Sequence, residues 1–155
     1  MINTEPLYRD IEELVLHRPP MLLVHALTEW DAISAEVLVN TQDSALFAET
    51  DGRIPAWVGI EYMAQAVSAY AGILAKQNGE PLCLGFLLGT RRYSTNVSHF
   101  SAGEQLRICV KELLRDETNL VLFDCHIYRG IDLLATAEIK AIQPKDAAST
   151  LLLKN

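Results

Sequence analysis

The sequence predicts an α+β domain in which a curved antiparallel sheet wraps around one long central helix. The stretch Trp57–Ala75 is apolar on nearly every side and rich in alanine, so it reads as a buried helix. The four segments after it alternate apolar and polar residues with a period of two, which is typical of strands with one wet face. A helix with no broad polar face has to be enclosed by the sheet, which predicts this arrangement.

The part of the chain before the helix predicts a hairpin. Residues Met21–Trp30 are apolar and β-branched, and Ile33–Val39 alternates apolar with polar side chains. The stretch Asp43–Arg53 is rich in Asp, Ser, Thr and Gly, which favours a loop, with a short helical turn expected around Ser44–Phe47.

The helix is predicted to begin near Pro55, because proline suits the first helical position. It should end at Asn78-Gly79, with Lys76 in its last turn. A membrane span needs roughly 20 apolar residues, and this helix is long enough. Polar residues such as Glu61 interrupt it and no basic cluster flanks it, so we expect no membrane insertion.

The chain after Gly79 predicts a series of strands joined by short polar turns, so neighbouring strands should pair antiparallel. We expect one domain over residues 1–155 with its core in residues 14–142, a sheet of five to seven strands, and a loosely held tail after Pro144. The predicted strands are Leu82–Tyr93, Gln105–Leu114, Leu120–Tyr128 and Leu133–Ile142, with Leu133 on the apolar face of the last.

Composition and charge exclude several classes of protein. Thirteen basic and twenty acidic residues give a net charge of −7 without a basic stripe, so nucleic acid is not an expected partner. The three cysteines, Cys83, Cys109 and Cys125, have no metal-ligand or disulfide-framework spacing, which indicates neither a zinc site nor disulfides. An N-terminus without an export signal then favours a reducing cytoplasm.

Four motifs resemble those of a known family and occur in the same order. They are HRPPMLLV at His17–Val24, PAWVGIEYMAQA at Pro55–Ala66, GFLLGTRRY at Gly85–Tyr93 and AGEQL at Ala102–Leu106. Taken together they are similar to the hotdog-fold 3-hydroxyacyl-acyl carrier protein (ACP) dehydratases, and within that superfamily to the ApeP-like branch associated with aryl polyene pigment synthesis. The resemblance covers about residues 14–142 and implies the hotdog fold.

The resemblance implies an activity that needs no metal or cofactor. Such enzymes remove water from a 3-hydroxyacyl chain carried on the phosphopantetheine arm of ACP, giving a trans-2-enoyl thioester. In the family a His takes the C2 proton, an acid on the central helix protonates the leaving hydroxyl, and a backbone N–H at the helix start polarises the thioester carbonyl. By motif position the acid is Glu61 and the N–H is that of Ala56.

The family's catalytic His is missing. An ungapped count back from Glu61 places it at Phe47, and His17 matches a different His of the family, near its first strand. Because family sites form at a dimer interface, a homodimer would lack the His twice, whereas a heterodimer with a His-bearing paralogue would keep one complete site. Two alternatives remain open: Glu49, Asp51 or a water serves as the base, or the chain is a non-catalytic subunit of a dehydratase.

Further substrate contacts follow from the resemblance, each with a simpler interpretation beside it. Arg91 and Arg92 would neutralise the pantetheine phosphate or an acidic carrier surface, or else form an ordinary strand end. Gln65 would bond across to loop backbone and Trp57 would line the acyl tunnel. By periodicity alone, Glu61 and Gln65 could belong to a solvated helix face. A different enzyme class, an acyl thioesterase, would use the same helical acid to activate water.

Overall fold

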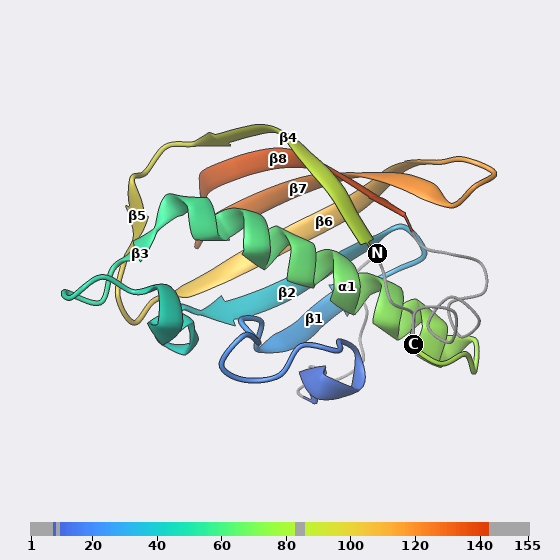
Figure 1. Cartoon of the computed structure of the whole chain (residues 1–155), viewed down its shortest axis with the longest axis horizontal. Coiled ribbons are helices and arrows are strands. Elements are labelled where there is room, and N and C mark those ends of the chain that lie inside the picture. The colour runs from blue at the N-terminus through green and yellow to red at the C-terminus, as the bar shows by residue number, and fades with distance from the viewer. Residues whose placement is uncertain (1–7, 9, 83–85, 143–155) are drawn as a thin grey trace.

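The computed structural model describes Tyr8, residues 10–82 and residues 86–142, with backbone alone for residues 86–88. One long helix lies across a curved six-stranded antiparallel sheet, which is the predicted hotdog architecture (Figure 1). In chain order the elements are 3-10 helix Ile11–Glu13, β1 Ala26–Trp30, β2 Ser34–Asn40, 3-10 helix Thr41–Phe47, β3 Ile54–Pro55, 3-10 turn Ala56–Val58, α1 Gly59–Gln77, β4 Phe86–Thr95, β5 His99–Phe100, β6 Gln105–Arg115, β7 Leu120–Arg129 and β8 Asp132–Ile142.

The strand order of the main sheet is β1-β2-β6-β7-β8-β4, and every neighbouring pair is antiparallel. The hairpin β1–β2 forms as predicted, and the four later strands lie within a few residues of their predicted limits. Strands β3 and β5 form a separate pair that the sequence did not predict, because two-residue strands leave no periodic pattern. Strands β1 and β4 form the two edges of the main sheet.

A β-bulge changes which residues of β8 face the core. Ile127 of β7 pairs with Ala135, but the next residue, Tyr128, pairs with Leu133. The extra residue, Leu134, therefore points inward and is 3% exposed, whereas Leu133 is 39% exposed. The prediction that Leu133 lies on the apolar face was wrong for this reason.

The helix has the predicted limits. The 3-10 turn begins at Ala56 directly after Pro55, and Gly79 adopts a positive φ of 69° just after the helix ends. Glycine is required at Gly72, where an added Cβ would lie 2.0 Å from the carbonyl oxygen of Leu14. The N-terminal segment thus packs directly on the helix backbone.

The helix has no solvated stripe along the line from Glu61 to Lys76. Gln65 is fully buried and Gly72 is buried, while Lys76 is exposed. The interpretation of this line as a solvated face is therefore wrong, because the N-terminal segment covers it. None of the helices among the described residues combines the length and hydropathy that crossing a bilayer requires. The predicted tail and Cys83 lie outside the described residues.

Candidate active site

The candidate acid, Glu61, lies in the first turn of α1 with its side chain 36% exposed. Residues four apart share one side of a helix, so Trp57, Glu61 and Gln65 form a line along α1. The Glu61 Oε1 atom accepts a hydrogen bond of 3.0 Å from Gln65 Nε2. The carboxyl group is thus held on one side while its other oxygen, Oε2, has no hydrogen-bond partner among the described residues.

Gln65 is a fixed donor, because its amide is fully engaged inside the protein. Its Oε1 accepts the N–H of Leu23 at 2.8 Å, and its Nε2 donates to the carbonyl of Met21 at 2.8 Å. These two contacts fix which end of the amide is nitrogen and leave the second N–H for Glu61. Gln65 therefore makes the contact with loop backbone that the resemblance implied, and it also orients the candidate acid.

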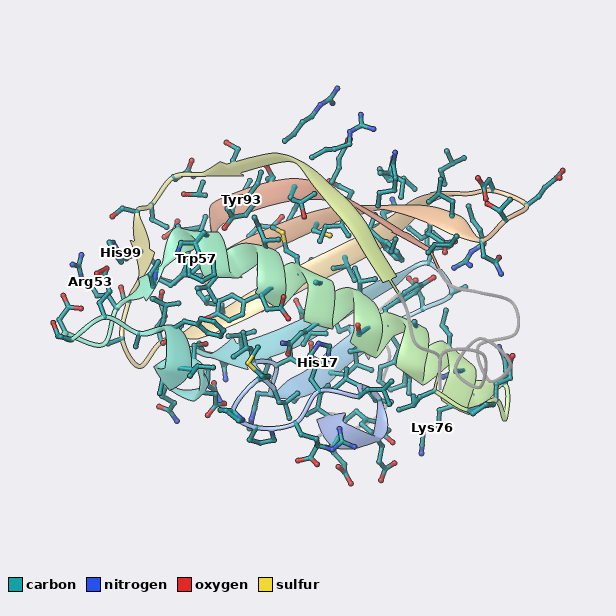
Figure 2. All side chains as sticks on the ribbon, viewed as in Figure 1. His17, Arg53, Trp57, Lys76, Tyr93 and His99 are labelled. Carbon is teal, nitrogen blue, oxygen red and sulfur yellow. The ribbon has the colours of Figure 1, made fainter. Side chains whose placement is uncertain are left out.

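His17, labelled in Figure 2, has its Nε2 atom 3.8 Å from Glu61 Oε1. The segment that carries it is braced by Arg18, whose guanidinium donates to the carbonyls of Glu12, Val15 and His17 at 3.1, 2.8 and 2.7 Å. The sequence does not predict His17 as a site residue. The HRPP motif was the available signal, but a contact across 44 residues of sequence has no periodic signature.

The start of the helix is held by strand β4 and by Ser98, the residue before β5. The Ala56 N–H donates to the carbonyl of Ser98 at 3.0 Å, and the Ala56 carbonyl accepts the hydroxyl of Tyr93 on β4. The assignment of Ala56 as a free donor is therefore corrected, since its N–H already has an acceptor. In a 3-10 turn that begins at Ala56, the N–H of Trp57 also lacks an acceptor within the helix, and it becomes the candidate carbonyl donor.

Trp57 presents an exposed apolar surface next to the candidate acid. Its side chain is 59% exposed, and its ring packs edge-on against Phe47 at a centroid distance of 5.7 Å. Phe47, the position that the ungapped count gave to the family's His, therefore supports the side chain one helical turn from Glu61. A phenyl ring cannot accept the C2 proton, so the base must come from another residue.

The two acidic loop residues considered as bases already have partners. Glu49 contacts the ring of His99, and Asp51 pairs with Arg53 at 2.6 Å. Hydrogen bonds from the Arg53 backbone N–H and guanidinium lower the pKa of Asp51, which weakens it as a base. Figure 2 shows Arg53, His99 and Trp57 at the same end of the molecule.

Arg91 and Arg92 lie on the edge strand β4, where the register shifts and Arg92 has a positive φ of 56°. Their guanidinium groups lie 3.7 and 3.9 Å from the two carboxylate oxygens of Glu138 on β8. With exposed fractions of 52% and 76%, both side chains remain open to a ligand. Their role toward phosphate stays a prediction.

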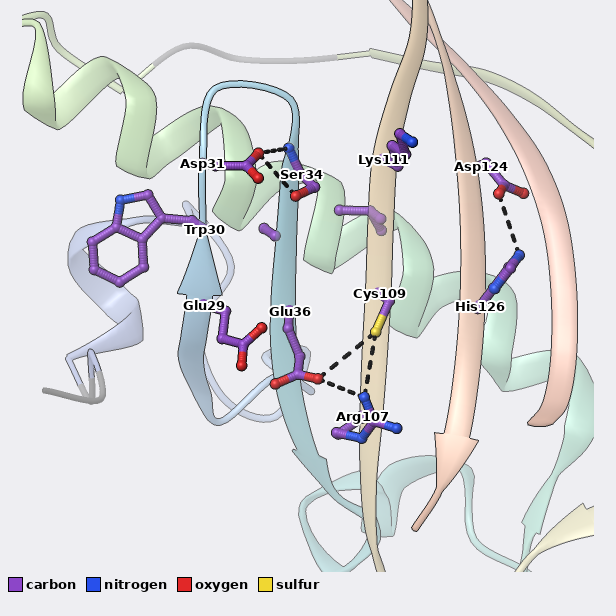
Figure 3. Close-up of a pocket in the computed structure, with 12 residues that line it drawn as sticks. Glu29, Trp30, Asp31, Ser34, Glu36, Arg107, Cys109, Lys111, Asp124 and His126 are labelled. Carbon is purple, nitrogen blue, oxygen red and sulfur yellow. Dashed lines mark hydrogen bonds and ion pairs between the residues drawn. The ribbon is translucent and has the colours of Figure 1, made fainter. Parts of the chain in front are cut away.

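A hollow of about 490 Å³ lies on the outer face of the sheet, opposite the helix (Figure 3). Its polar groups largely satisfy one another: Glu36 accepts from Arg107 at 2.7 Å, and Asp124 lies 3.3 Å from His126. Burial raises the pKa of Cys109, in the middle of this face, to about 11. Within residues 8, 10–82 and 86–142, no group of three or more His, Cys, Asp or Glu side chains is arranged to hold a metal ion.

Comparisons with solved structures agree with the fold. The chain is 28% identical to a chain of the dehydratase heterocomplex ApeI:P from Xenorhabdus doucetiae, with a TM-score of 0.81, covering 92% of this chain and 96% of that one. An uncharacterized protein from Pyrococcus horikoshii is 13% identical with a TM-score of 0.64, over 86% of this chain and 92% of the other. A virulence protein from Campylobacter jejuni is 14% identical with a TM-score of 0.61, over 87% and 88%.

The last two similarities show the fold alone, because their identities are low. No curated protein matches the chain by sequence. The family model that describes the ApeP dehydratase matches residues 9–152, which include Glu61, Gln65, His17 and the whole described sheet. The chain belongs to the ApeP-like family of dehydratases.

Proposed function

We propose that the chain dehydrates 3-hydroxyacyl thioesters, carried on the phosphopantetheine arm of ACP, to trans-2-enoyl thioesters in aryl polyene or fatty acid type synthesis. One observation carries the proposal: the carboxyl group of Glu61, about one third exposed, is held at the start of the central helix by a fully buried amide. Family membership supplies the reaction class, and the resemblance supplies the thioester substrate.

Glu61 is the general acid in this proposal. A base removes the C2 proton, the electron pair of that C–H bond forms the C2=C3 double bond, and the C3–O bond breaks as Glu61 protonates the leaving hydroxyl. Water leaves, and proton transfer from the base restores the acid. The Trp57 N–H polarises the thioester carbonyl at the positive end of the helix.

The base comes from a His-bearing dehydratase subunit paired with this chain. Phe47, Glu49 and Asp51 do not offer a free base, because the first is a phenyl ring and the other two are paired. The similar protein from Xenorhabdus doucetiae is part of a dehydratase heterocomplex, which supports a subunit of this kind. Within the described part of the chain, the edge strand β4 has one unpaired side, on which such a partner would extend the sheet.

The substrate would arrive on an acidic carrier, although this chain has a net charge of −7. Binding therefore requires a local positive surface, and the exposed guanidinium groups of Arg91 and Arg92 supply one near the carrier's phosphate in this proposal. The free thiols of Cys109 and Cys125 are compatible with a reducing cytoplasm, the compartment we propose.

Product analysis tests the function. A 3-hydroxyacyl-ACP is incubated with the chain alone and with its dehydratase partner, and the acyl group is analysed by mass spectrometry. We expect loss of one water, abolished by Glu61→Gln but not by Glu80→Gln, a matched change at an exposed Glu beyond the helix. Release of free acid would make the chain a thioesterase. An unchanged rate with Glu61→Gln in the complex would make it a non-catalytic subunit.

A further inference from the structure

We propose that His17 donates a hydrogen bond from Nε2 to the 3-hydroxyl group of the substrate and holds that oxygen against Glu61. This inference rests on the proposed function, because it requires a 3-hydroxyacyl substrate. It assigns to His17 a contact with the substrate and not the removal of the C2 proton.

The distance between the two side chains carries the first step. At 3.8 Å, His17 Nε2 and Glu61 Oε1 are too far apart for a direct hydrogen bond. A third atom can, however, lie within hydrogen-bond distance of both groups at once, since two contacts of about 2.8 Å span a gap of this size. Both side chains are about one third exposed, so a ligand can reach the space between them.

The other ring nitrogen of His17 determines which one carries the proton. Nδ1 is buried and has no hydrogen-bond partner among the residues that the structure describes. An orphaned N–H inside a protein is rarer than an under-satisfied acceptor, because the lost donor bond is not replaced by water. The neutral ring therefore carries its proton on Nε2, the nitrogen that faces Glu61. Nε2 can then donate a hydrogen bond but cannot accept the C2 proton.

The position of His17 relative to Glu61 is fixed from two directions. Arg18 ties three carbonyls of the segment before and at His17, as described above. The residues that follow return to the helix, where Met21 and Leu23 bond to Gln65, the same amide that holds Glu61. The donor and the acid are thus parts of one hydrogen-bonded unit, and substrate binding would not require either to move far.

This role predicts a specific pattern among three variants of His17. Gln places an amide N–H near the position of Nε2 and keeps a donor, whereas Asn is shorter and Met has no donor. Each variant is assayed for kcat/KM on a 3-hydroxyacyl-ACP, in the assembly that dehydrates it. We expect His17→Gln to stay within about 5-fold of the unchanged protein and His17→Met and His17→Asn to fall about 10- to 100-fold, the range for one hydrogen bond to a reacting group. His25→Met, at an exposed His of the same segment, should have no effect.

Binding of a non-reacting ligand separates contact with the hydroxyl from damage to the fold. His17→Met should weaken binding of the 3-hydroxyacyl-ACP to a Glu61→Gln background, but not that of the saturated acyl-ACP, which lacks the hydroxyl. Thermal unfolding of each variant checks that it folds. If His17→Met does not fold, the comparison of His17→Gln with His17→Asn takes its place. If His17→Gln is as inactive as His17→Met, His17 acts as the base and the inference is overturned. Full activity of His17→Met would also overturn the inference, as would an equal loss of binding for the 3-hydroxyacyl-ACP and the saturated acyl-ACP. In either case, water loss that depends on Glu61 would leave the proposed function intact.

Discussion

Replacing Gln65 with Met nearly preserves side-chain volume but removes an amide that hydrogen-bonds to three groups. These are the Leu23 N–H, the Met21 carbonyl and the Glu61 carboxyl group. Leu23 is 0% exposed, so its N–H would lose its acceptor and stay buried, at a cost of about 1–3 kcal/mol. The lost bond to the Met21 carbonyl adds about 0.5–1.5 kcal/mol, because that loop residue is exposed enough for water to compensate in part. We expect a total destabilisation of about 1.5–4.5 kcal/mol, or roughly 3–18 °C in Tm for a domain of this size.

Urea unfolding of Gln65→Met measures this loss, with Gln77→Met as the matched control at an exposed position near the end of the same helix. The control should change stability by less than about 0.5 kcal/mol. A loss below about 1 kcal/mol for Gln65→Met would refute the argument that the buried Leu23 N–H depends on this amide. Gln65→Met also removes the hydrogen bond that orients Glu61, so the fraction of this variant that is folded should show a lower kcat.

Gly72→Ala should reduce Tm strongly, because its Cβ would lie 2.0 Å from the backbone carbonyl oxygen of Leu14 and neither atom can move away without a shift of the backbone. Gly89→Ala, where an added Cβ has nothing within 4 Å, should fold normally. Lys76→Met should lower the stability of the fold at neutral pH. Hydrogen bonds from Lys76 and Tyr8 lower the pKa of Glu13 from 4.5 to about 2. The stabilisation that they give is therefore present above pH 4.5 and is lost as the pH falls towards 2. If the difference in Tm between Lys76→Met and the unchanged protein does not shrink from pH 4.5 to pH 2, the stabilisation does not come from the interaction of Lys76 with Glu13. Burial raises the pKa of Cys109 to about 11, so alkylation at pH 7.5 should label it in urea but not in the folded protein, as read by peptide mass spectrometry. Tyr93→Phe should cost about 1 kcal/mol in thermal unfolding through the lost bond to the Ala56 carbonyl, and no change would show that this bond does not hold the helix start.

Periodicity predicted most of the fold because it reports local structure. The alternation along β7 matches its burial at every position from Val121 to Ile127, and the glycine after Asn78 ends the helix as predicted. The bulge at Leu134 could not be predicted, since it depends on how β8 pairs with its neighbour and not on its own sequence.

The site was predictable only in part, for a related physical reason. Glu61 followed from a motif, and its neighbours on the helix followed from spacing. The contacts that give the carboxyl its surroundings join residues far apart in sequence: Gln65 with Leu23, His17 with Glu61, and Ala56 with Ser98. Such contacts depend on how the N-terminal segment and the residue before β5 pack against the helix, so motif positions alone predict Ala56 as the donor and do not predict His17 as a site residue.

The arrangement around Glu61 bears on whether this subunit is catalytic. Gln65 would already be satisfied by Met21 and Leu23 if it served only to attach the loop, so its third bond adds nothing to that attachment. Glu61 is about one third exposed and gains little stability from the bond. A subunit that only supports its partner has no need of this carboxyl group, whereas a composite site needs it even if the loop His is lost. Glu61→Gln should therefore leave the unfolding free energy nearly unchanged while it abolishes dehydration, and a large loss of stability would instead make Glu61 a structural residue.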